Sequence, residues 1–370
     1  MTKVLEVFGE PISNGGQESF VINVIQNMDR SGLQIDLLTP YYCSNDNYRA
    51  LVHSWNGRIF EFRLKFAPGE SRKNLLAAVY KFLKENRYDV VHVHSGSISV
   101  LMYVSLAAKL ARVREIIVHS HCAGEKETLK HSIIKMVAAP VLSLCPTKHC
   151  SCSTIAGEFK YPFWIVKRRM KLIKNGVDLN AFRYNAERSA EVRWKLGISK
   201  NTCVVGHVGR FSSQKNHSFL IKVFAALHQR NTDSVLLLIG NGDLMPEAQR
   251  QVHLMGLDSS VIFAGNVSNV WDYMQVMDVF VLPSKFEGLP IVMVEAQAAG
   301  VAVVASDAVT KEASLVDQVR FISLDAPLDD WVSAVENAAS TPRFDEAERI
   351  RSKGFDIHSI AAEVCMLYKA

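Results

Sequence analysis

The sequence predicts an α/β protein with two doubly wound, Rossmann-like domains. Three observations support this fold class. The chain has 370 residues, of which 48% are hydrophobic, so it can bury two cores. Short runs rich in β-branched residues alternate with helical patterns in both halves, as is typical of parallel sheets covered on both faces. No run approaches the roughly 20 apolar residues that a membrane-spanning helix needs.

The first half contains five short runs that are expected to be strands, because each is dense in β-branched residues. They cover residues 3–9, 33–40, 58–64, 89–95 and 115–121, and helical patterns are found near 16–31, 72–87 and 98–111. This order predicts one doubly wound domain at residues 1–165.

The second half repeats the alternation and predicts a second domain at residues 179–345. Its expected strands cover residues 203–210, 234–240, 261–266, 279–284 and 302–306, with helices near 216–229, 244–255 and 269–276. Residues 166–178 contain an Asn-Gly turn and little periodicity, so we expect a linker there. Residues 346–370 are expected to be helical, with an interruption at Gly354, and to pack back on the first domain. Ligands of such sheets bind beyond the carboxyl ends of the strands, so a cleft between two facing domains is the expected site.

Positive charge is concentrated in the first half of the chain. Residues 1–172 hold 23 Lys/Arg against 14 Asp/Glu, or +9, and the remainder holds 19 against 23, or −4. This excess, which includes "KRRMKLIK" at 167–174, suits an anionic membrane surface or a phosphate-bearing substrate, and an ordinary solvated face would explain it equally well. The start of the chain lacks the features of a secretory signal. We therefore expect a cytoplasmic protein, with peripheral contact to the inner face of the cell membrane as a hypothesis, and no nucleic-acid partner.

The seven cysteines are an odd number without paired CxxC spacing, which favours reduced thiols over disulfides. The segment "KHCSC" at 148–152 resembles half of a metal cluster. No second cluster completes four ligands, so a zinc site is not expected there.

Glycine turns follow strands in both halves. Gly15 and Gly16 lie before an expected helix, where backbone N–H groups can approach an anion, although a simple turn is an equal alternative. The spacing is not GxGxxG, which disfavours a nicotinamide enzyme. Gly240 and Gly242 form a second such turn in the other half.

Arg210 and Lys215 follow the expected strand at 203–210, just before a helix that begins near Asn216. Two cations and a helix N-terminus beside the end of a parallel strand favour a diphosphate site. The alternative is that both side chains are merely solvated.

Glu287 and Glu295 stand in the otherwise apolar run "SKFEGLPIVMVEAQAAG" at 284–300. An ionised carboxylate in apolar surroundings costs several kcal/mol unless it is paired. Pro290 favours the first turn of a helix, so Glu287 is expected in the loop and Glu295 one to two turns inside. Hydroxyls of a bound nucleotide sugar would supply the partners. The alternative is a helix-start charge and a bond from Glu295 to a neighbouring backbone group.

These motifs together resemble the retaining glycosyltransferases of family 4, which have the GT-B fold of two facing α/β domains. The resemblance covers nearly the whole chain, in the order "GGQE", "VHSH", "NGVD", "GRFSSQKN", "GNGD", "FAGNV" and the E-x7-E run "EGLPIVMVE". The segment "EAQAAGVAVVASDAVTKEASL" is most similar to the branch that makes bacterial capsule and exopolysaccharide.

The resemblance implies a role for each matching residue. Arg210 and Lys215 would hold the donor diphosphate, which Gly16 would approach from the other domain, and Glu287 would position the donor sugar. The remaining implied contacts are the loop residues Gly288, Leu289 and Pro290, the ribose ligand Glu295 and the base-contacting backbone of Val267.

The resemblance also implies a histidine near the donor sugar. In "VHSHC", His121 matches the family position and His119 competes with it, since strand alternation puts both on one face. The position nearest the strand end favours His121. Cys122 stands where the family commonly has an acidic residue or asparagine.

The implied reaction is a metal-independent transfer, without a cofactor, from a UDP-sugar to a saccharide that is expected to be lipid-linked. No DxD metal motif is found, and Asn45-Asp46-Asn47 falls in an expected loop of the other half. Two alternatives share the donor: a nucleotide-sugar 2-epimerase and a non-catalytic sugar-nucleotide-binding subunit. A third is a metal-dependent hydrolase that uses His92, His94, His119 and His121, but no acidic ligand from another strand end stands out beside them.

Overall fold

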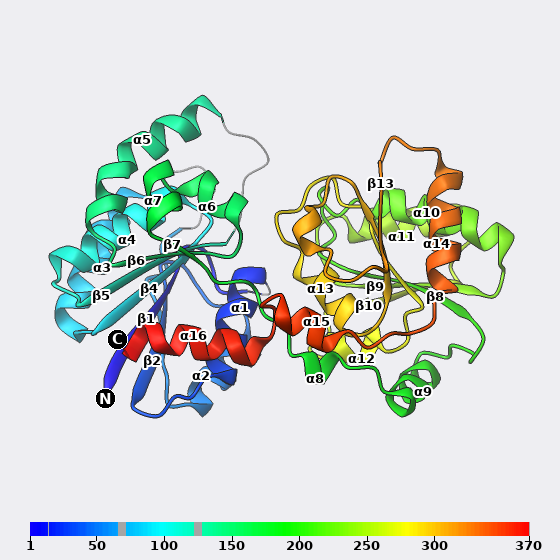
Figure 1. Ribbon diagram of the computed structural model, residues 1–370, viewed down its shortest axis with the longest axis horizontal. Helices are drawn as coiled ribbons and strands as arrows, with labels where there is room; N and C mark the ends of the chain where they lie inside the picture. The colour runs from blue at the N-terminus through cyan, green and yellow to red at the C-terminus, as the bar shows by residue number, and fades with distance from the viewer. Residues whose placement is uncertain (14, 66–71, 122–127, 370) are drawn as a thin grey trace. The chain divides into compact units, whose positions relative to one another are not determined.

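The computed structural model describes residues 1–13, 15–65, 72–121 and 128–369 (Figure 1). It divides into two compact units. Unit 1 comprises Met1–Gly176 and Ile357–Ala370, and unit 2 comprises Val177–Asp356. Each unit is a parallel sheet with helices packed on both faces, so the predicted fold class is confirmed.

Unit 1 contains a seven-stranded sheet with the order β3-β2-β1-β4-β5-β6-β7. All pairings between these strands are parallel. The strands are β1 (Thr2–Phe8), β2 (Leu33–Thr39), β3 (Ile59–Glu61), β4 (Val90–Ser95), β5 (Glu115–Ser120), β6 (Lys148–Ser151) and β7 (Met170–Leu172).

The helices of unit 1 cover the two faces of this sheet. They are α1 (Gly16–Asn27), α2 (Asp46–Ser54), α3 (Lys73–Asn86), α4 (Ile98–Leu110), α5 (Leu129–Leu144), α6 (Thr154–Lys160), α7 (Phe163–Arg168) and α16 (Ile357–Lys369). Side chains of β1 alternate between the two cores: Val4 packs in the cluster with α1 and α16, and Leu5 in the cluster with α3 and α4. Every second residue of β1, such as Val4 and Phe8, therefore lies under α1 and α16.

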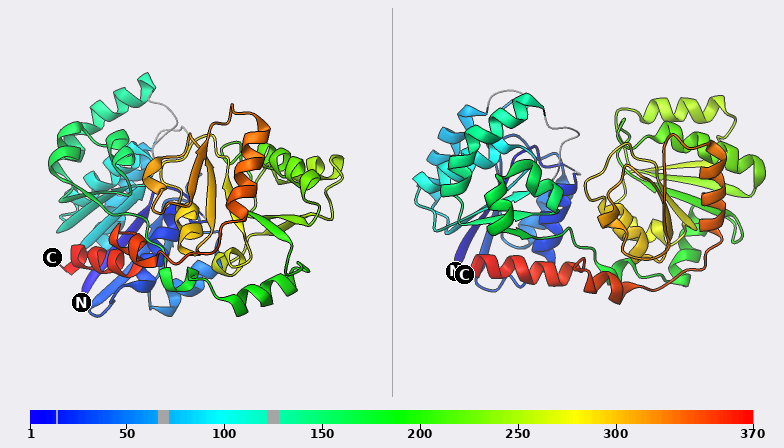
Figure 2. Two further views of the ribbon diagram at one scale, coloured as in Figure 1. Left: turned by 45° about the vertical axis from the view of Figure 1, so that its right-hand side comes forward. Right: turned by 45° about the horizontal axis from the view of Figure 1, so that its top comes forward.

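Helix α16 is the last element of the chain and belongs to unit 1. It packs against α1 and β1, and the two further views show it lying along this unit (Figure 2). Its buried residues are Ile357, Ile360, Ala361, Val364, Cys365, Leu367 and Tyr368. Their spacing of three and four residues forms one apolar face that completes the core on this side of the sheet.

Several elements of unit 1 differ from the sequence-based expectation. Strand β6 lies in the segment "KHCSC", where no strand was expected because the residues are polar. In the structure, β6 pairs with β5 and most of its side chains are buried. The end of helix α7 and all of strand β7 lie within residues 166–178, which were expected to be a linker. Asn45 caps α2 by accepting from the backbone N–H of Tyr48, so Asp46 and Asn47 are helical rather than in a loop.

Unit 2 contains a six-stranded parallel sheet with the order β10-β9-β8-β11-β12-β13. Its strands are β8 (Cys203–Val208), β9 (Ser234–Ile239), β10 (Val261–Gly265), β11 (Val279–Leu282), β12 (Ala302–Ser306) and β13 (Val319–Ile322). The helical elements are α8 (Leu179–Phe182), α9 (Ala186–Lys195), α10 (His217–Arg230), α11 (Met245–Leu254), α12 (Val270–Met274), α13 (Ile291–Ala298), η1 (Lys311–Ala313), α14 (Leu328–Ala339) and α15 (Ala347–Ser352). Among the helices of the described residues, none is long and apolar enough to cross a bilayer.

Candidate functional site

In unit 2, four neighbouring strands end at the same edge of the sheet. Strands β10, β9, β8 and β11 are adjacent and parallel, so the loops that follow them meet there. These loops contain Val267, the Gly240–Gly242 turn, the Arg210–Lys215 segment and Glu287. The residues that sequence analysis selected in this half therefore come from one edge of one sheet.

Gly240 and Gly242 shape the edge by letting two loops touch through their backbones. Both have positive φ angles, 134° and 156°. A Cβ atom on Gly240 would lie 2.2 Å from the carbonyl oxygen of Gly209, and one on Gly242 would lie 2.5 Å from that of Phe211. Any side chain at these positions would push the segment that contains Arg210 and Lys215 away from the sheet.

Hydrogen bonds join this segment to the loop that contains Glu287. The Nε2 atom of Gln214 donates to the carbonyl of Phe286 at 3.0 Å, and the N–H of Lys285 donates to the carbonyl of Gln214 at 2.8 Å. Asn216, in the left-handed region at φ 58°, donates from Nδ2 to the carbonyl of Pro283 at 3.2 Å. The two loops thus form one bonded structure.

Lys215 and Glu287 form an ion pair at this edge. The Nζ atom of Lys215 lies 2.6 Å from Oε1 of Glu287, and the side chains are only 15% and 10% exposed. Ser284 also donates to Oε1 of Glu287 at 2.9 Å. The stem of Lys215 crosses Gly209, where a Cβ atom would come within 3.1 Å of its Cδ. Glu287 thus has protein partners in the absence of a ligand.

Glu295 lies in the second turn of α13, which begins at Ile291 with Pro290 as its N-cap, one residue later than expected. The side chain is half-buried and accepts no hydrogen bond from the described residues. Burial raises the pKa of Glu295 to about 7, and the charge of Lys215 opposes part of that rise. A hydroxyl-bearing ligand would supply the missing donor.

Arg210 is exposed and forms no hydrogen bond or ion pair within the described ranges. Its guanidinium is therefore available to an anion at this edge. Val267 follows β10 and packs partly against the core of unit 2.

Two glycines near the strand ends are not explained by packing within the chain. A Cβ atom added to Gly288 or to Gly16 would meet nothing within 4 Å, and neither residue has a positive φ angle. By contrast, a Cβ on Gly15 would lie 2.2 Å from the carboxylate of Glu18. Open space at Gly16 and Gly288 would admit the close approach of a ligand. Leu289, beside Gly288, is half-buried against the core.

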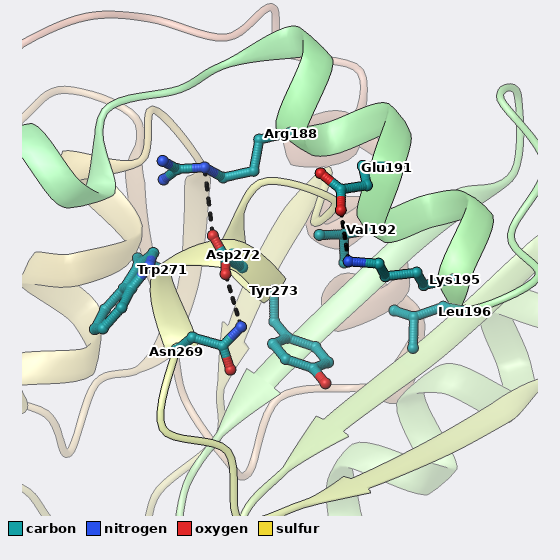
Figure 3. A pocket seen from close by; sticks show the side chains of 9 residues that line it. All are labelled: Arg188, Glu191, Val192, Lys195, Leu196, Asn269, Trp271, Asp272 and Tyr273. Atoms are coloured by element: carbon teal, nitrogen blue, oxygen red, sulfur yellow. Dashed lines mark hydrogen bonds and ion pairs between the residues drawn. The ribbon is translucent and has the colours of Figure 1, made fainter.

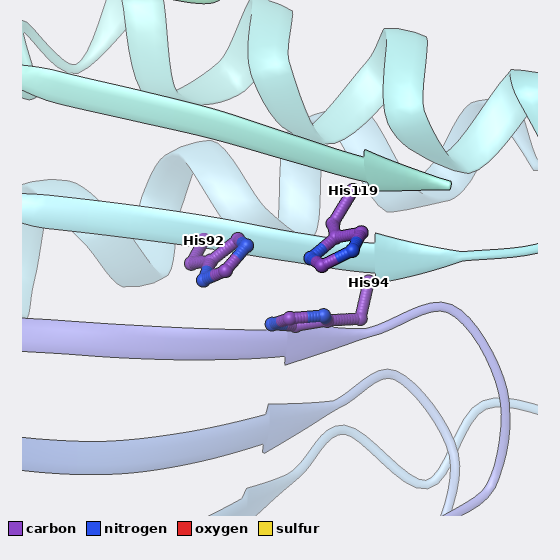
Figure 4. A group of neighbouring side chains, drawn as sticks. All are labelled: His92, His94 and His119. Atoms are coloured by element: carbon purple, nitrogen blue, oxygen red, sulfur yellow. The ribbon is translucent and has the colours of Figure 1, made fainter. Parts of the chain in front are cut away.

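In unit 1, three histidines and one glutamate gather under α1 and α16. Glu6 on β1, His92 and His94 on β4, and His119 on β5 are on the same face, and the register pairs Glu6 with His92 and His94 with His119. Figure 4 shows the rings of His92, His94 and His119 beside one another, and ligand atoms of the three lie within 4.8 Å of each other. Burial lowers the pKa of every one of these histidines, so the imidazoles are neutral.

His121 lies one residue beyond β5 and is half-buried, whereas His119 is fully buried. The Nε2 atom of His121 lies 2.8 Å from Nδ1 of His94, and its ring packs 5.1 Å from that of Phe20 on α1. Of the two competitors, His121 is the one with surface at the carboxyl edge. Its neighbour Cys122 lies outside the described residues.

Glu6 and Tyr368 also belong to this cluster and were not among the residues expected from the sequence. No acidic ligand from another strand end was expected, and Glu6 lies within β1, with Oε2 2.7 Å from Nε2 of His94. The sequence could have indicated Glu6, because it is the one carboxylate in the apolar run "KVLEVFG" and a buried carboxylate needs polar partners. Tyr368 comes from the far end of the chain, 362 residues away, and no local pattern marks it.

A separate pocket of about 320 Å³ lies between α9 and α12 (Figure 3). Its charged side chains are paired with one another: Arg188 with Asp272 at 3.4 Å and Lys195 with Glu191 at 2.5 Å. None of the residues selected from the sequence lines it. The pairing leaves its charges satisfied without a ligand.

Two family models match the chain. One, described as "Glycosyltransferase Family 4", matches residues 14–181, and one described as "Glycosyl transferases group 1" matches residues 202–339. The protein EpsF of Bacillus subtilis, named as a glycosyltransferase, is 33% identical over 340 residues, which cover 90% of this chain and 86% of EpsF.

A second relative and a solved structure are also similar. The Escherichia coli protein named UDP-Gal:alpha-D-GlcNAc-diphosphoundecaprenol alpha-1,3-galactosyltransferase is 29% identical over 242 residues, 63% of this chain and 61% of that protein. The crystal structure of Anabaena HepE in complex with UDP and glucose matches with a TM-score of 0.76 at 20% identity, covering 100% of both chains.

Proposed function

Because this chain belongs to glycosyltransferase family 4 and has the GT-B fold, we propose that it transfers a sugar from a UDP-sugar to a lipid-linked saccharide. The transfer retains the anomeric configuration and uses no metal ion. The product is an intermediate of capsule or exopolysaccharide synthesis.

One observation carries the donor assignment: Arg210, Lys215, Glu287 and Glu295 come from one edge of the unit 2 sheet. The two cations at that edge can bind a diphosphate. The half-buried carboxylate of Glu295, which accepts no hydrogen bond from the described residues, can accept one from a ribose hydroxyl. Glu287 fits a hydroxyl of the donor sugar, and Val267 fits the base. The open space at Gly288 leaves room for the ligand beside Leu289 and Pro290.

The proposed chemistry follows from charge. Breaking the bond between sugar and phosphate develops negative charge on the leaving diphosphate, and fixed cations lower that barrier directly. Arg210 and Lys215 supply this charge from the protein. The departing phosphate oxygen takes the proton of the acceptor hydroxyl on the same face of the sugar. A covalent double displacement would need a carboxylate nucleophile, and Glu295 is assigned to the ribose instead.

The choice of UDP is supported by the relatives. The E. coli relative is named for UDP-Gal, and the HepE structure contains UDP with glucose. The roles implied for Gly15, Gly16 and His121 of unit 1 remain predictions.

The lipid-linked acceptor is supported by the E. coli relative and by one surface of unit 1. The name of that relative includes a diphosphoundecaprenol-linked saccharide. On α5, exposed apolar residues recur at helical spacing, and α7 adds exposed aromatic ones. These residues are Leu129, Ile133, Met136, Val137, Leu144, Phe163 and Trp164, and we call them the apolar face.

Hydrogen bonds and basic residues extend this face. Trp164 donates from Nε1 to Oγ of Ser143 at 3.1 Å, which fixes α7 against the end of α5. Exposed Lys167, Arg168 and Arg169 follow directly. Exposed aromatic and aliphatic side chains beside cations suit the interface of an anionic bilayer, so we propose peripheral contact with the inner face of the cell membrane at this face.

The proposal is tested with the purified full chain. A thermal-shift screen of UDP-sugars against GDP- and dTDP-sugars should identify a stabilising donor, since a ligand at 100 times its dissociation constant adds about 2.7 kcal/mol. Incubation with that donor and a polyprenyl-diphosphate saccharide should yield a product with the donor's anomeric configuration, measured by proton NMR. Absence of stabilisation by every nucleotide sugar would refute the function. Isomerised donor without acceptor would identify an epimerase, and donor binding without any turnover would identify a binding subunit.

A further inference from the structure

A chain of hydrogen bonds connects the buried core of unit 1 to His121. Nε2 of His121 lies 2.8 Å from Nδ1 of His94, and Nε2 of His94 lies 2.7 Å from Oε2 of Glu6. The hydroxyl of Tyr368 donates to Oε1 of Glu6, and Nδ1 of His92 lies 2.7 Å from that hydroxyl. Glu6 therefore lies where two branches of the network end.

The branch to His121 has one consistent set of protons when Glu6 is ionised. A carboxylate only accepts, so Nε2 of His94 must carry the hydrogen. Nδ1 of His94 is then the acceptor, because a neutral imidazole has one N–H. Nε2 of His121 must therefore donate to it, and the lone pair of His121 is left on Nδ1.

Burial supports neutral rings, and the hydrogen bonds to Glu6 support its ionised form. Glu6 and His94 are each 1% exposed, and burial lowers the pKa of His94 to about 3. Burial raises the pKa of Glu6, and the hydrogen bond donated by Tyr368 acts in the opposite direction. Tyr368 and His94 place one donor on each carboxylate oxygen, an arrangement that favours the charged form.

We propose that Glu6 and His94 are positioning residues that hold His121 as the Nε2–H tautomer and present its Nδ1 atom as a hydrogen-bond acceptor. Nδ1 of His121 is buried and has no hydrogen-bond partner among the described residues. The ligand that fits it is a hydroxyl donor, and in the transfer reaction this is a hydroxyl of a saccharide. This last step rests on the proposed function, whereas the tautomer does not.

A metal site is the alternative to this network, since ring nitrogens of His92, His94 and His119 are close enough to bind one ion together. Both ring nitrogens of His94 are already within 2.8 Å of a partner. An ion could bind there only if His94 gave up one of these bonds. The network therefore favours the hydrogen-bonded arrangement, and metal binding becomes an outcome of the test.

The first test is the tautomer of His121 in the full-length protein, measured by long-range ¹H–¹⁵N correlation with ¹⁵N-labelled histidine and assigned with His121→Gln. The expected result is protonated Nε2 and unprotonated Nδ1. The Nδ1–H tautomer, an imidazolium, or about one equivalent of bound metal by elemental analysis would overturn the proposal. The wild-type spectrum decides this even if a variant does not fold.

The second test uses Glu6→Gln, whose amide can donate to His94 and so admit the opposite tautomer. We expect a mixed or reversed His121 tautomer and a kcat lowered at least about tenfold, with KM for the donor within about twofold. Tyr368→Phe is the matched control, because it removes a bond to Glu6 but leaves the His94 branch in place. An unchanged tautomer in Glu6→Gln would refute the positioning role. A shifted tautomer with unchanged kcat would refute only the link to the reaction.

Discussion

Lys215 and Glu287 lie 2.6 Å apart, Nζ to Oε1, in a partly buried ion pair that joins two loops at one edge of the unit 2 sheet. Each carries a role in the proposed transfer, one toward the diphosphate and one toward the sugar. Because the charges are paired before a ligand binds, neither is left unpaired in a low-dielectric site. The pair also explains how a sequence can place Glu287 so close to an apolar run.

Lys215→Ala should lower the transfer rate at least about 100-fold, because it removes a fixed cation from the leaving group. It should also destabilise the fold, since Glu287 loses its ionic partner. The double variant Lys215→Met/Glu287→Gln should regain stability but not activity, and Lys222→Ala on the exposed face of α10 is the control. Rates and urea unfolding measure both effects. Near-normal turnover in the single variant would remove Lys215 from the site.

Arg210→Ala should also lower the rate at least about 100-fold, but with a stability change below about 0.5 kcal/mol, because its guanidinium is exposed. UDP binding should weaken in the same variant, measured by calorimetry. Arg250→Ala, an exposed arginine on α11, should change neither quantity. Equal behaviour of the two variants would contradict the diphosphate role.

Glu295→Gln should change the pH dependence of stability. The pKa of Glu295 is about 7 in the folded chain and near 4.5 when unfolded, so the folded state binds more protons between these values. Stability from this group is therefore lost as the pH rises from about 4.5 to 7. The variant should match wild type near pH 4.5 and exceed it above pH 7, by at most about 3 kcal/mol. Urea unfolding across this range measures it, and a difference independent of pH would count against the shift.

Gly240→Ala should destabilise unit 2 and weaken donor binding together. Its Cβ would lie 2.2 Å from the carbonyl oxygen of Gly209, which would displace the backbone next to Arg210. Gly256→Ala is a matched control, because Gly256 also has a positive φ of 68° but open space around it. Both variants bear the strain of a positive φ angle, which is about 1–2 kcal/mol in the left-handed region of Gly256. Gly240, at 134°, lies outside that region. Only Gly240→Ala should raise the dissociation constant for UDP, and an equal effect of both would refute the explanation.

Phe163→Ala/Trp164→Ala should reduce binding to liposomes that contain anionic lipid, since it removes two exposed aromatic anchors from the apolar face. Flotation with and without anionic lipid measures the loss, and added salt should weaken binding of the wild type. Trp194→Ala is the control, because Trp194 is 80% exposed but lies in unit 2. Wild-type protein that stays in solution with anionic vesicles would refute the membrane contact.

The sequence predicted five of the six strands of unit 2, because each of the five is a short run rich in apolar residues. Strand β13 was not predicted, since Arg320 interrupts its apolar residues. The parallel order then brings Arg210 and Glu287 to the same edge without any further information.

The network of unit 1 shows where local signals end. Strand β6 is built from "KHCS", whose polar residues form a buried strand only because neighbouring strands complete their hydrogen bonds. Tyr368 reaches Glu6 across 362 residues of sequence. Hydrogen bonds between residues so far apart in sequence depend on the assembled fold. The periodicity of a single segment therefore cannot predict them.

The return of α16 to unit 1 has a consequence for synthesis of the chain. While a ribosome is translating residues 177–356, all strands of the unit 1 sheet have already been synthesised. The helix α16, which covers part of one face of that sheet, has not. Unit 1 therefore exposes this apolar face until residues 357–369 have been synthesised. A chain that stopped before residue 357 would lack this cover, and the damage would fall on the unit whose sheet is synthesised first.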